Sequence, residues 1–117
     1  MNNPSSTKTK DILSILLDDT NLKILDLLDG KEHSIQQVSS LLDIPLSSTY
    51  RKIGKLEKLG LIKKTKVVRT LDGMDESVYT LWAYEITVSY KDNSLSFKIK
   101  QKPLDDKIVR LWQKFKS

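Results

Sequence analysis

The 117-residue sequence predicts an α+β fold in a single domain, and three observations lead to this class. Apolar residues recur at helical spacing from Asp11 to Gly60. After Gly60 the pattern changes to an alternation of apolar and polar residues, which is typical of strands. Helical spacing returns after Pro103. Helices and strands therefore occupy separate stretches of the chain, as they do in α+β folds.

Two helices are predicted before residue 30. Residues 11–18 (DILSILLD) place Ile12, Ile15 and Leu16 on one face. The run Asp18-Asp19-Thr20 is typical of an N-cap and predicts a second helix at residues 21–28. The sequence leaves open whether these are two helices or one bent helix. Residues 1–10 are polar and are expected to form a disordered tail, so the domain is expected to span residues 11–117.

The next two helices are predicted within residues 34–60. Ser34 and Gln37 have the spacing of a capping box, in which each side chain pairs with a backbone N–H of the other residue. Pro45 interrupts the helical pattern and suits the start of the next helix, which is expected to end at Gly60. The first of these helices has a stripe of apolar residues that is expected to be buried: Ile35, Val38, Leu41 and Leu42.

The second helix of this pair has two different sides. Its apolar side carries Tyr50, Ile53, Leu56 and Leu59. Its other side carries hydroxyls and cations: Ser47, Ser48, Arg51, Lys52 and Lys55. Two helices joined by a tight turn, with cations on the outer face of the second, are typical of a helix-turn-helix.

The positive charge is concentrated in one segment. Residues 46–70 carry eight Lys or Arg and one acid, a net charge of +7, whereas residues 1–45 carry −3 and residues 71–117 carry +1. A concentrated basic field indicates a polyanionic partner. Charge by itself is equally consistent with a solvated lysine-rich helix face. Beside the helix-turn-helix pattern, it favours nucleic acid.

Two β-hairpins are predicted after the helix-turn-helix. The first, a wing at residues 61–82, turns at Asp72-Gly73. Because its loop is acidic, phosphate contacts are expected from the strand residues Lys64, Lys66 and Arg69. The second hairpin, at residues 84–102, has one apolar face, and its lysines on the other face are expected to be solvated.

The last predicted helix, at residues 104–116, repeats apolar residues on one stripe. In a chain of this size, that helix and the one at residues 11–18 compete for a limited core. At least one of the two is therefore expected to form a dimer interface. The expected interface residues are Ile12, Ile15, Leu16, Ile108, Leu111, Trp112 and Phe115.

Several classes of function are disfavoured. The chain has no cysteine and one histidine, His33, which lies in a polar loop and is expected to face solvent, so no metal site is predicted. No catalytic set and no phosphate-binding glycine loop is present, so neither an enzyme nor a cofactor is expected. No stretch approaches the roughly 20 apolar residues of a membrane span, and a signal-peptide core is missing, so a cytoplasmic location is expected.

Residues 19–81 resemble the winged helix-turn-helix domain of small prokaryotic transcription regulators of the ArsR-like class, especially archaeal ones. The resemblance is carried by NLKILDLL (21–28), LSSTYRKI (46–53) and LEKLGLI (56–62). It implies a homodimer whose two reading helices enter successive major grooves of an inverted-repeat operator. It also places Ser47, Ser48, Thr49, Tyr50 and Arg51 at the front of the reading helix, and Lys52 and Lys55 on its backbone-facing flank.

Two features depart from the family pattern. Pro45 stands where many relatives carry a capping serine, so the start of the reading helix is expected to be arranged differently. The metal-sensing members use cysteine or clustered histidine, which this chain lacks, so metal responsiveness does not carry over.

The sequence therefore predicts a DNA-binding transcription regulator that binds double-stranded DNA sequence-specifically as a homodimer. The alternative is a winged-helix module that binds another protein within a larger assembly. The +7 segment argues against that alternative, because the cores of protein interfaces are depleted in lysine.

Overall fold

The computed structural model describes residues 4–103 and has the winged helix-turn-helix architecture that the sequence predicts. The predicted C-terminal helix, with Ile108, Leu111, Trp112 and Phe115, lies outside these residues. The elements, in chain order, are α1 (Pro4–Leu16), α2 (Asp19–Leu27), β1 (His33–Ser34), α3 (Ile35–Leu42), α4 (Leu46–Lys58), β2 (Ile62–Arg69), β3 (Asp75–Leu81), β4 (Ala83–Lys91) and β5 (Ser94–Gln101).

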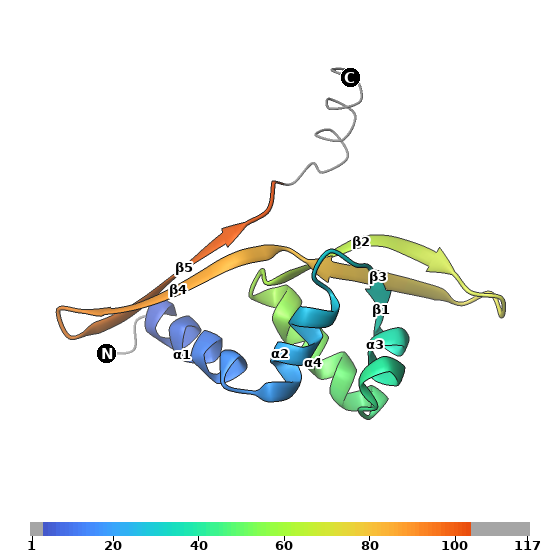
Figure 1. Ribbon diagram of the computed structural model, residues 1–117, viewed down its shortest axis with the longest axis horizontal. Helices are drawn as coiled ribbons and strands as arrows, with labels where there is room; N and C mark the ends of the chain where they lie inside the picture. Colours follow the sequence, from blue (N-terminus) through green and yellow to red (C-terminus); the bar gives the residue numbers. More distant parts are fainter. Residues whose placement is uncertain (1–3, 104–117) are drawn as a thin grey trace, which may run out of the picture.

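The four helices lie on one side of two long hairpins, which extend in opposite directions from the middle of the molecule (Figure 1). The wing, β2–β3, forms an antiparallel sheet with the short strand β1, in the order β1-β3-β2. Strands β4 and β5 pair separately as the second hairpin. Both predicted hairpins are thus confirmed, and the wing is the one that follows the helix-turn-helix directly.

Helix α1 begins earlier than the sequence predicts. It starts at Pro4, so the prediction of a disordered tail is wrong for residues 4–10. Thr9 is completely buried, because it lies one turn before Ile12 and shares its inward face. The sequence prediction considered only apolar residues, so it did not extend the buried stripe of this helix to Thr9. Helices α1 and α2 are separate, and the side chain of Asp18 caps α2 by accepting hydrogen bonds from the backbone N–H groups of Thr20 and Asn21.

The inward face of α1 belongs to the core of this chain. Ile12 and Ile15 are 0% and 3% exposed, so the prediction that they contact a second copy is wrong. The second hairpin provides the cover, since α1 packs against β5 and the apolar face of that hairpin borders the core. Leu16 is half-buried against the same core.

The helix-turn-helix is fixed by local hydrogen bonds. The predicted capping box is present: Ser34 Oγ accepts from the Gln37 N–H at 3.2 Å, and Gln37 Oε1 accepts from the Ser34 N–H at 2.9 Å. Asp43 ends α3 in the left-handed conformation, with φ +53°. Gly60 follows α4 with φ +81°, which favours glycine. Leu41 is 59% exposed, so its place in the predicted buried stripe of α3 is wrong.

His33 does not face solvent as predicted. It is half-buried because His33 and Ser34 form β1, where His33 pairs with Tyr79 of β3. Its Nε2 atom is buried and has no hydrogen-bond partner among residues 4–103. The loop composition did not indicate a strand only two residues long.

The two sheets meet at Trp82, between β3 and β4. Its backbone N–H donates to the Leu61 carbonyl at 2.9 Å, and its indole Nε1–H donates to the Lys102 carbonyl at 3.0 Å. The Nζ atom of Lys63 lies 5.9 Å from the centre of the indole ring, a cation–π distance. These contacts tie the start of the wing to the base of the second hairpin. Within the described part of the chain, no helix is long and apolar enough to cross a membrane.

Candidate nucleic-acid interface

Helix α4 buries one face and exposes the opposite one. Thr49, Ile53 and Leu56 are completely buried, at positions i, i+4 and i+7. This spacing marks one face of a helix, so residues half a turn away must point outward. The outward residues are exposed: Ser47, Tyr50, Arg51, Gly54, Lys55 and Lys58. Arg51 and Lys55 therefore lie on an accessible face of the molecule, while Ser48 is half-buried at its border.

Thr49 is not available to a partner. Its side chain is 0% exposed, and its Oγ1–H donates to the Pro45 carbonyl at 2.9 Å. Pro45, at the N-cap of α4, makes no side-chain capping hydrogen bond. The Thr49 hydroxyl donates to the carbonyl of the N-cap residue, so it does not replace a capping serine, whose oxygen would accept from an N–H group of the first turn. The prediction that Thr49 contacts DNA is wrong, because the helix turns that side chain toward the core.

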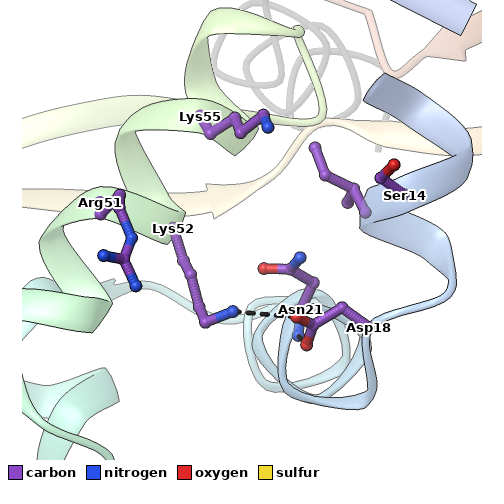
Figure 2. Close-up of a pocket in the computed structure, with 7 residues that line it drawn as sticks. Ser14, Asp18, Asn21, Arg51, Lys52 and Lys55 are labelled. Atoms are coloured by element: carbon purple, nitrogen blue, oxygen red, sulfur yellow. Dashed lines mark hydrogen bonds and ion pairs between the residues drawn. The ribbon is translucent and has the colours of Figure 1, made fainter. Parts of the chain in front are cut away.

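Lys52 binds inside the molecule rather than extending outward. Its Nζ lies 3.1 Å from Asp18 Oδ2, and its side chain is only 21% exposed (Figure 2). The pair spans a cleft of about 230 Å³ between α4 and the α1–α2 corner. The lining residues are Ser14, Ile15, Asp18, Asn21, Arg51, Lys52 and Lys55. Lys52 therefore joins α4 to the cap of α2, and its predicted role as a free phosphate contact is not supported by this position.

Asp18 should make stability depend on acid pH. The Lys52 hydrogen bond, followed by the Asn21 N–H, lowers the pKa of Asp18 below its ordinary value of 3.8. A carboxylate with a lowered folded-state pKa contributes stability above its unfolded pKa, and this contribution is lost as the pH falls through the folded value. We expect Asp18→Asn, which keeps an N-capping side chain, to lower the unfolding midpoint at pH 6 more than at pH 2.5. Thermal unfolding of both proteins across this range measures it; an equal loss at both pH values would contradict it.

Arg51 and Lys55 have no ion-pair partner among the residues that the structure describes. Both line the cleft from the α4 side (Figure 2). Lys58, one turn beyond Lys55 on the exposed face, was not among the predicted site residues, although it belongs to the +7 segment. Its spacing from Arg51, i to i+7, was the signal that could have found it.

Tyr50 lies at the edge of the outward face. Tyr50 is 52% exposed, so the prediction that it belongs to the buried apolar side of α4 is wrong. Its exposed position in the second turn of α4 leaves it accessible to a partner. Burial chiefly raises the pKa of Tyr79 in β3, and the charges of Glu57 and Tyr50 add to the effect. Tyr79 is 6% exposed and belongs to the same buried cluster as Ile53 and Leu56 of α4, so the face of the wing that carries Tyr79 is turned toward α4.

The wing separates its three predicted phosphate contacts. A β-bulge lies between Lys64 and Lys66, so that Lys64 pairs with Tyr79 whereas Lys66 pairs with Val78. Directly opposed residues share a face of a sheet, and successive residues alternate. Lys64 and Arg69 thus lie on the α4-facing side, and Lys66 lies on the other side, 3.2 Å from Glu32.

The cations of the wing differ in their surroundings. Lys64 and Arg69 are both exposed. The Arg69 Nε atom lies 3.6 Å from Asp75 Oδ1 across the strand pair, but the arginine side chain is 76% exposed. An exposed pair of this kind contributes little stability and can open to another anion. Lys64 and Arg69 therefore lie on the face of the wing that is turned toward α4, and Lys66 lies on the opposite face.

Gly54 is an unexpected residue on the outward face. It lies in the interior of α4 and is exposed, and a Cβ built there would meet no atom within 4 Å. Its φ is not positive, unlike those of Gly30, Gly60 and Gly73. Glycine inside a helix is destabilising by about 0.5–1 kcal/mol relative to alanine. Neither the conformation nor the packing of the described residues requires glycine at this position.

No group of three or more His, Cys, Asp or Glu side chains that could hold a metal ion occurs within residues 4–103. The candidate site consists instead of cations, hydroxyls and an aromatic ring. These groups are suited to contacts with a polyanion.

Residues 16–65, from the end of α1 to the first half of β2, match a family of helix-turn-helix domains. Among solved structures, reduced HlyU from Vibrio cholerae N16961 is similar with 26% identity and a TM-score of 0.52, over 65% of this chain and 74% of that one. A further structure of HlyU from the same organism is similar over 97% of both chains, with 18% identity and a TM-score of 0.52. An ArsR-like transcriptional regulator from Rhodococcus sp. RHA1 is similar over 69% of both chains, with 20% identity and a TM-score of 0.54. No curated protein matches the sequence.

Proposed function

We propose that this chain is a transcription regulator of the ArsR-like type that binds double-stranded DNA sequence-specifically as a homodimer. The observation that carries the proposal is the outward face of α4, where Arg51, Lys55 and Lys58 are exposed and pair with no acid among residues 4–103. The helix-turn-helix match over residues 16–65 and the likeness to the structure of an ArsR-like transcriptional regulator support it. The sequence also resembles archaeal members of this class in particular, and this closer relationship stays a prediction.

The proposed mechanism assigns separate tasks to phosphate and base contacts. Lys55 and Lys58 of α4, with Lys64 and Arg69 of the wing, displace counterions from the DNA backbone and supply sequence-independent affinity. Arg51 reads base edges, for which a bidentate arginine contact contributes about 1–3 kcal/mol of discrimination. Ser47 and Tyr50 add contacts from the first turns of the helix. Binding beside a promoter would block or recruit the transcription machinery.

The homodimer is proposed because the resemblance to the ArsR-like class implies an operator with two-fold symmetry, an inverted repeat. A dimer places two reading helices about 34–36 Å apart, one turn of DNA. Of the proposed interface residues, Leu16 remains half-buried, and Ile108, Leu111, Trp112 and Phe115 remain predictions from the sequence. Selection of bound duplexes from random DNA tests this arrangement, because a dimer enriches inverted repeats with that spacing.

The phosphate contacts predict a steep dependence on salt. We expect Lys64→Ala to weaken binding to all duplexes by a similar factor and to reduce the slope of log K against log[salt] by about 1. Fluorescence anisotropy with a labelled duplex, titrated at several salt concentrations, measures the slope. Lys66→Ala is the matched control, because Lys66 lies on the opposite side of the wing and pairs with Glu32. Equal effects of the two substitutions would contradict the assignment of Lys64.

The same experiment separates the proposal from its alternative. A winged-helix module that binds another protein would show no affinity for duplex DNA at low salt. The concentration of lysine and arginine around α4 favours DNA, since interface cores between proteins are depleted in lysine. We further propose a cytoplasmic protein without enzymatic activity, in keeping with a regulator.

A further inference from the structure

We infer that Gly54 marks the point where the backbone of α4 lies closest to the base edges of bound DNA, and that its missing side chain is a determinant of sequence preference. This inference rests on the proposed function, because it takes DNA as the partner of α4. Gly54 itself would make no side-chain contact; it would act by leaving room for the DNA to approach the helix backbone.

The described part of the fold does not require glycine at position 54. Gly54 has an ordinary helical conformation, and a Cβ would project into open space. Gly60 offers the contrast within the same chain: its φ is +81°, and a Cβ there would lie 2.7 Å from the Gln101 side chain. Gly60 is therefore explained by the fold, whereas Gly54 is not. A helix that carries an unfavourable residue without structural need points to a demand from outside the described residues.

Gly54 lies on an uncharged part of the outward face of α4. Ser47, Tyr50 and Gly54 follow at i, i+3 and i+7 and form an uncharged strip along the outward face. Arg51, Lys55 and Lys58 form a parallel cationic strip beside it. DNA presents phosphates at the rims of the major groove and base edges at its floor. The uncharged strip therefore suits the floor of the groove. Lys55 and Lys58 suit the rim, and the guanidinium of Arg51 extends from the cationic strip toward the base edges, in keeping with its proposed role.

The place of Gly54 along α4 sets how the helix would lie on DNA. Leu46 and Tyr50, 42% and 52% exposed, lie in the first two turns of α4, and Gly54 lies in the third. A helix inserted only by its N-terminus would leave the third turn away from the bases. Close approach at Gly54 means that α4 lies along the groove. Any side chain at position 54 would then lift the middle of the helix and weaken the contacts of the turns on either side.

Gly54→Ala tests this directly, since alanine improves the helix while adding one methyl group. We expect its melting temperature to rise by about 4 °C. We also expect affinity for the operator selected from random DNA to fall about tenfold, the effect of one mismatched base pair, while low-salt binding to an unrelated duplex stays unchanged. Thr7→Ala is the matched control: Thr7 is exposed on α1, and alanine there also favours helix, so operator affinity should not change.

Each other outcome overturns the inference. If Gly54→Ala bound the operator as tightly as the unchanged protein, the backbone would not approach the bases. If binding to the operator and to the unrelated duplex fell equally, the close approach would be to phosphate instead. Should the unchanged protein bind no duplex at all, the proposed function would fail, and this result is distinguishable because it precedes the comparison of variants.

Discussion

Arg51→Ala is expected to reduce affinity for the selected operator by about 1–3 kcal/mol, roughly 5- to 150-fold, while most of the low-salt affinity for unrelated duplexes remains. The guanidinium is exposed on the outward face of α4, one turn after Ser47. It presents a planar pair of donors that matches the acceptors of guanine in the major groove. Lysine cannot reproduce this geometry, so Arg51→Lys should recover charge but little discrimination. Parallel titrations of the operator and an unrelated duplex measure the ratio.

The control for this prediction is Lys55→Ala, which removes a cation from the same helix face one turn away. Loss of a phosphate contact should weaken both duplexes alike. If Arg51→Ala lowered the two affinities by equal factors, as Lys55→Ala does, Arg51 would be a phosphate contact. The shared position of Arg51 and Lys55 on the wall of the α4 cleft makes this comparison informative.

Ile12→Ala is expected to lower the free energy of unfolding by about 2–5 kcal/mol, the usual cost of truncating a fully buried isoleucine. Ile12 is 0% exposed within a single chain, where α1 packs on the second hairpin. Out of a total stability of about 5–15 kcal/mol, this loss is large. Chemical denaturation monitored by the fluorescence of the two tryptophans measures it.

Leu17→Ala provides the comparison, since Leu17 follows α1 directly but is 83% exposed. Its truncation should change the free energy of unfolding by less than about 0.5 kcal/mol. A small effect of Ile12→Ala, accompanied by a shift from dimer to monomer in sedimentation, would restore Ile12 to an interface between copies. A large effect without such a shift assigns it to the core.

The sequence predicted the positions of the candidate site residues correctly only where these positions depend on neighbouring residues in the chain. The exposed positions of Arg51 and Lys55 followed from the spacing of Ile53 and Leu56, because a helix places residues i and i+3 or i+4 on one face whatever surrounds it. The capping box between Ser34 and Gln37 was equally local and is present. The resemblance to the ArsR-like class placed Thr49 at the front of the reading helix, whereas its spacing from Ile53 and Leu56 puts it on the buried face of α4.

Other residues depended on partners far away in the chain. Lys52 is bound to Asp18, 34 residues earlier, and no spacing rule connects the two. The β-bulge in β2 moved Lys66 to the opposite side of the wing from Lys64, and a strand pattern cannot show an inserted residue until its partner strand is known. His33 became half-buried through pairing with Tyr79.

By itself, the sequence determined the order of helices and hairpins, the polarity of α4 and the concentration of positive charge around it. These features depend on the periodicity of neighbouring side chains and on local hydrogen bonds, which form from short segments. Only the tertiary structure decided which cations face outward unpaired, and that α1 is covered by the chain's own second hairpin. Burial and ion pairing depend on which distant segments meet, and this is set by the packing of the whole core rather than by any one stretch of residues.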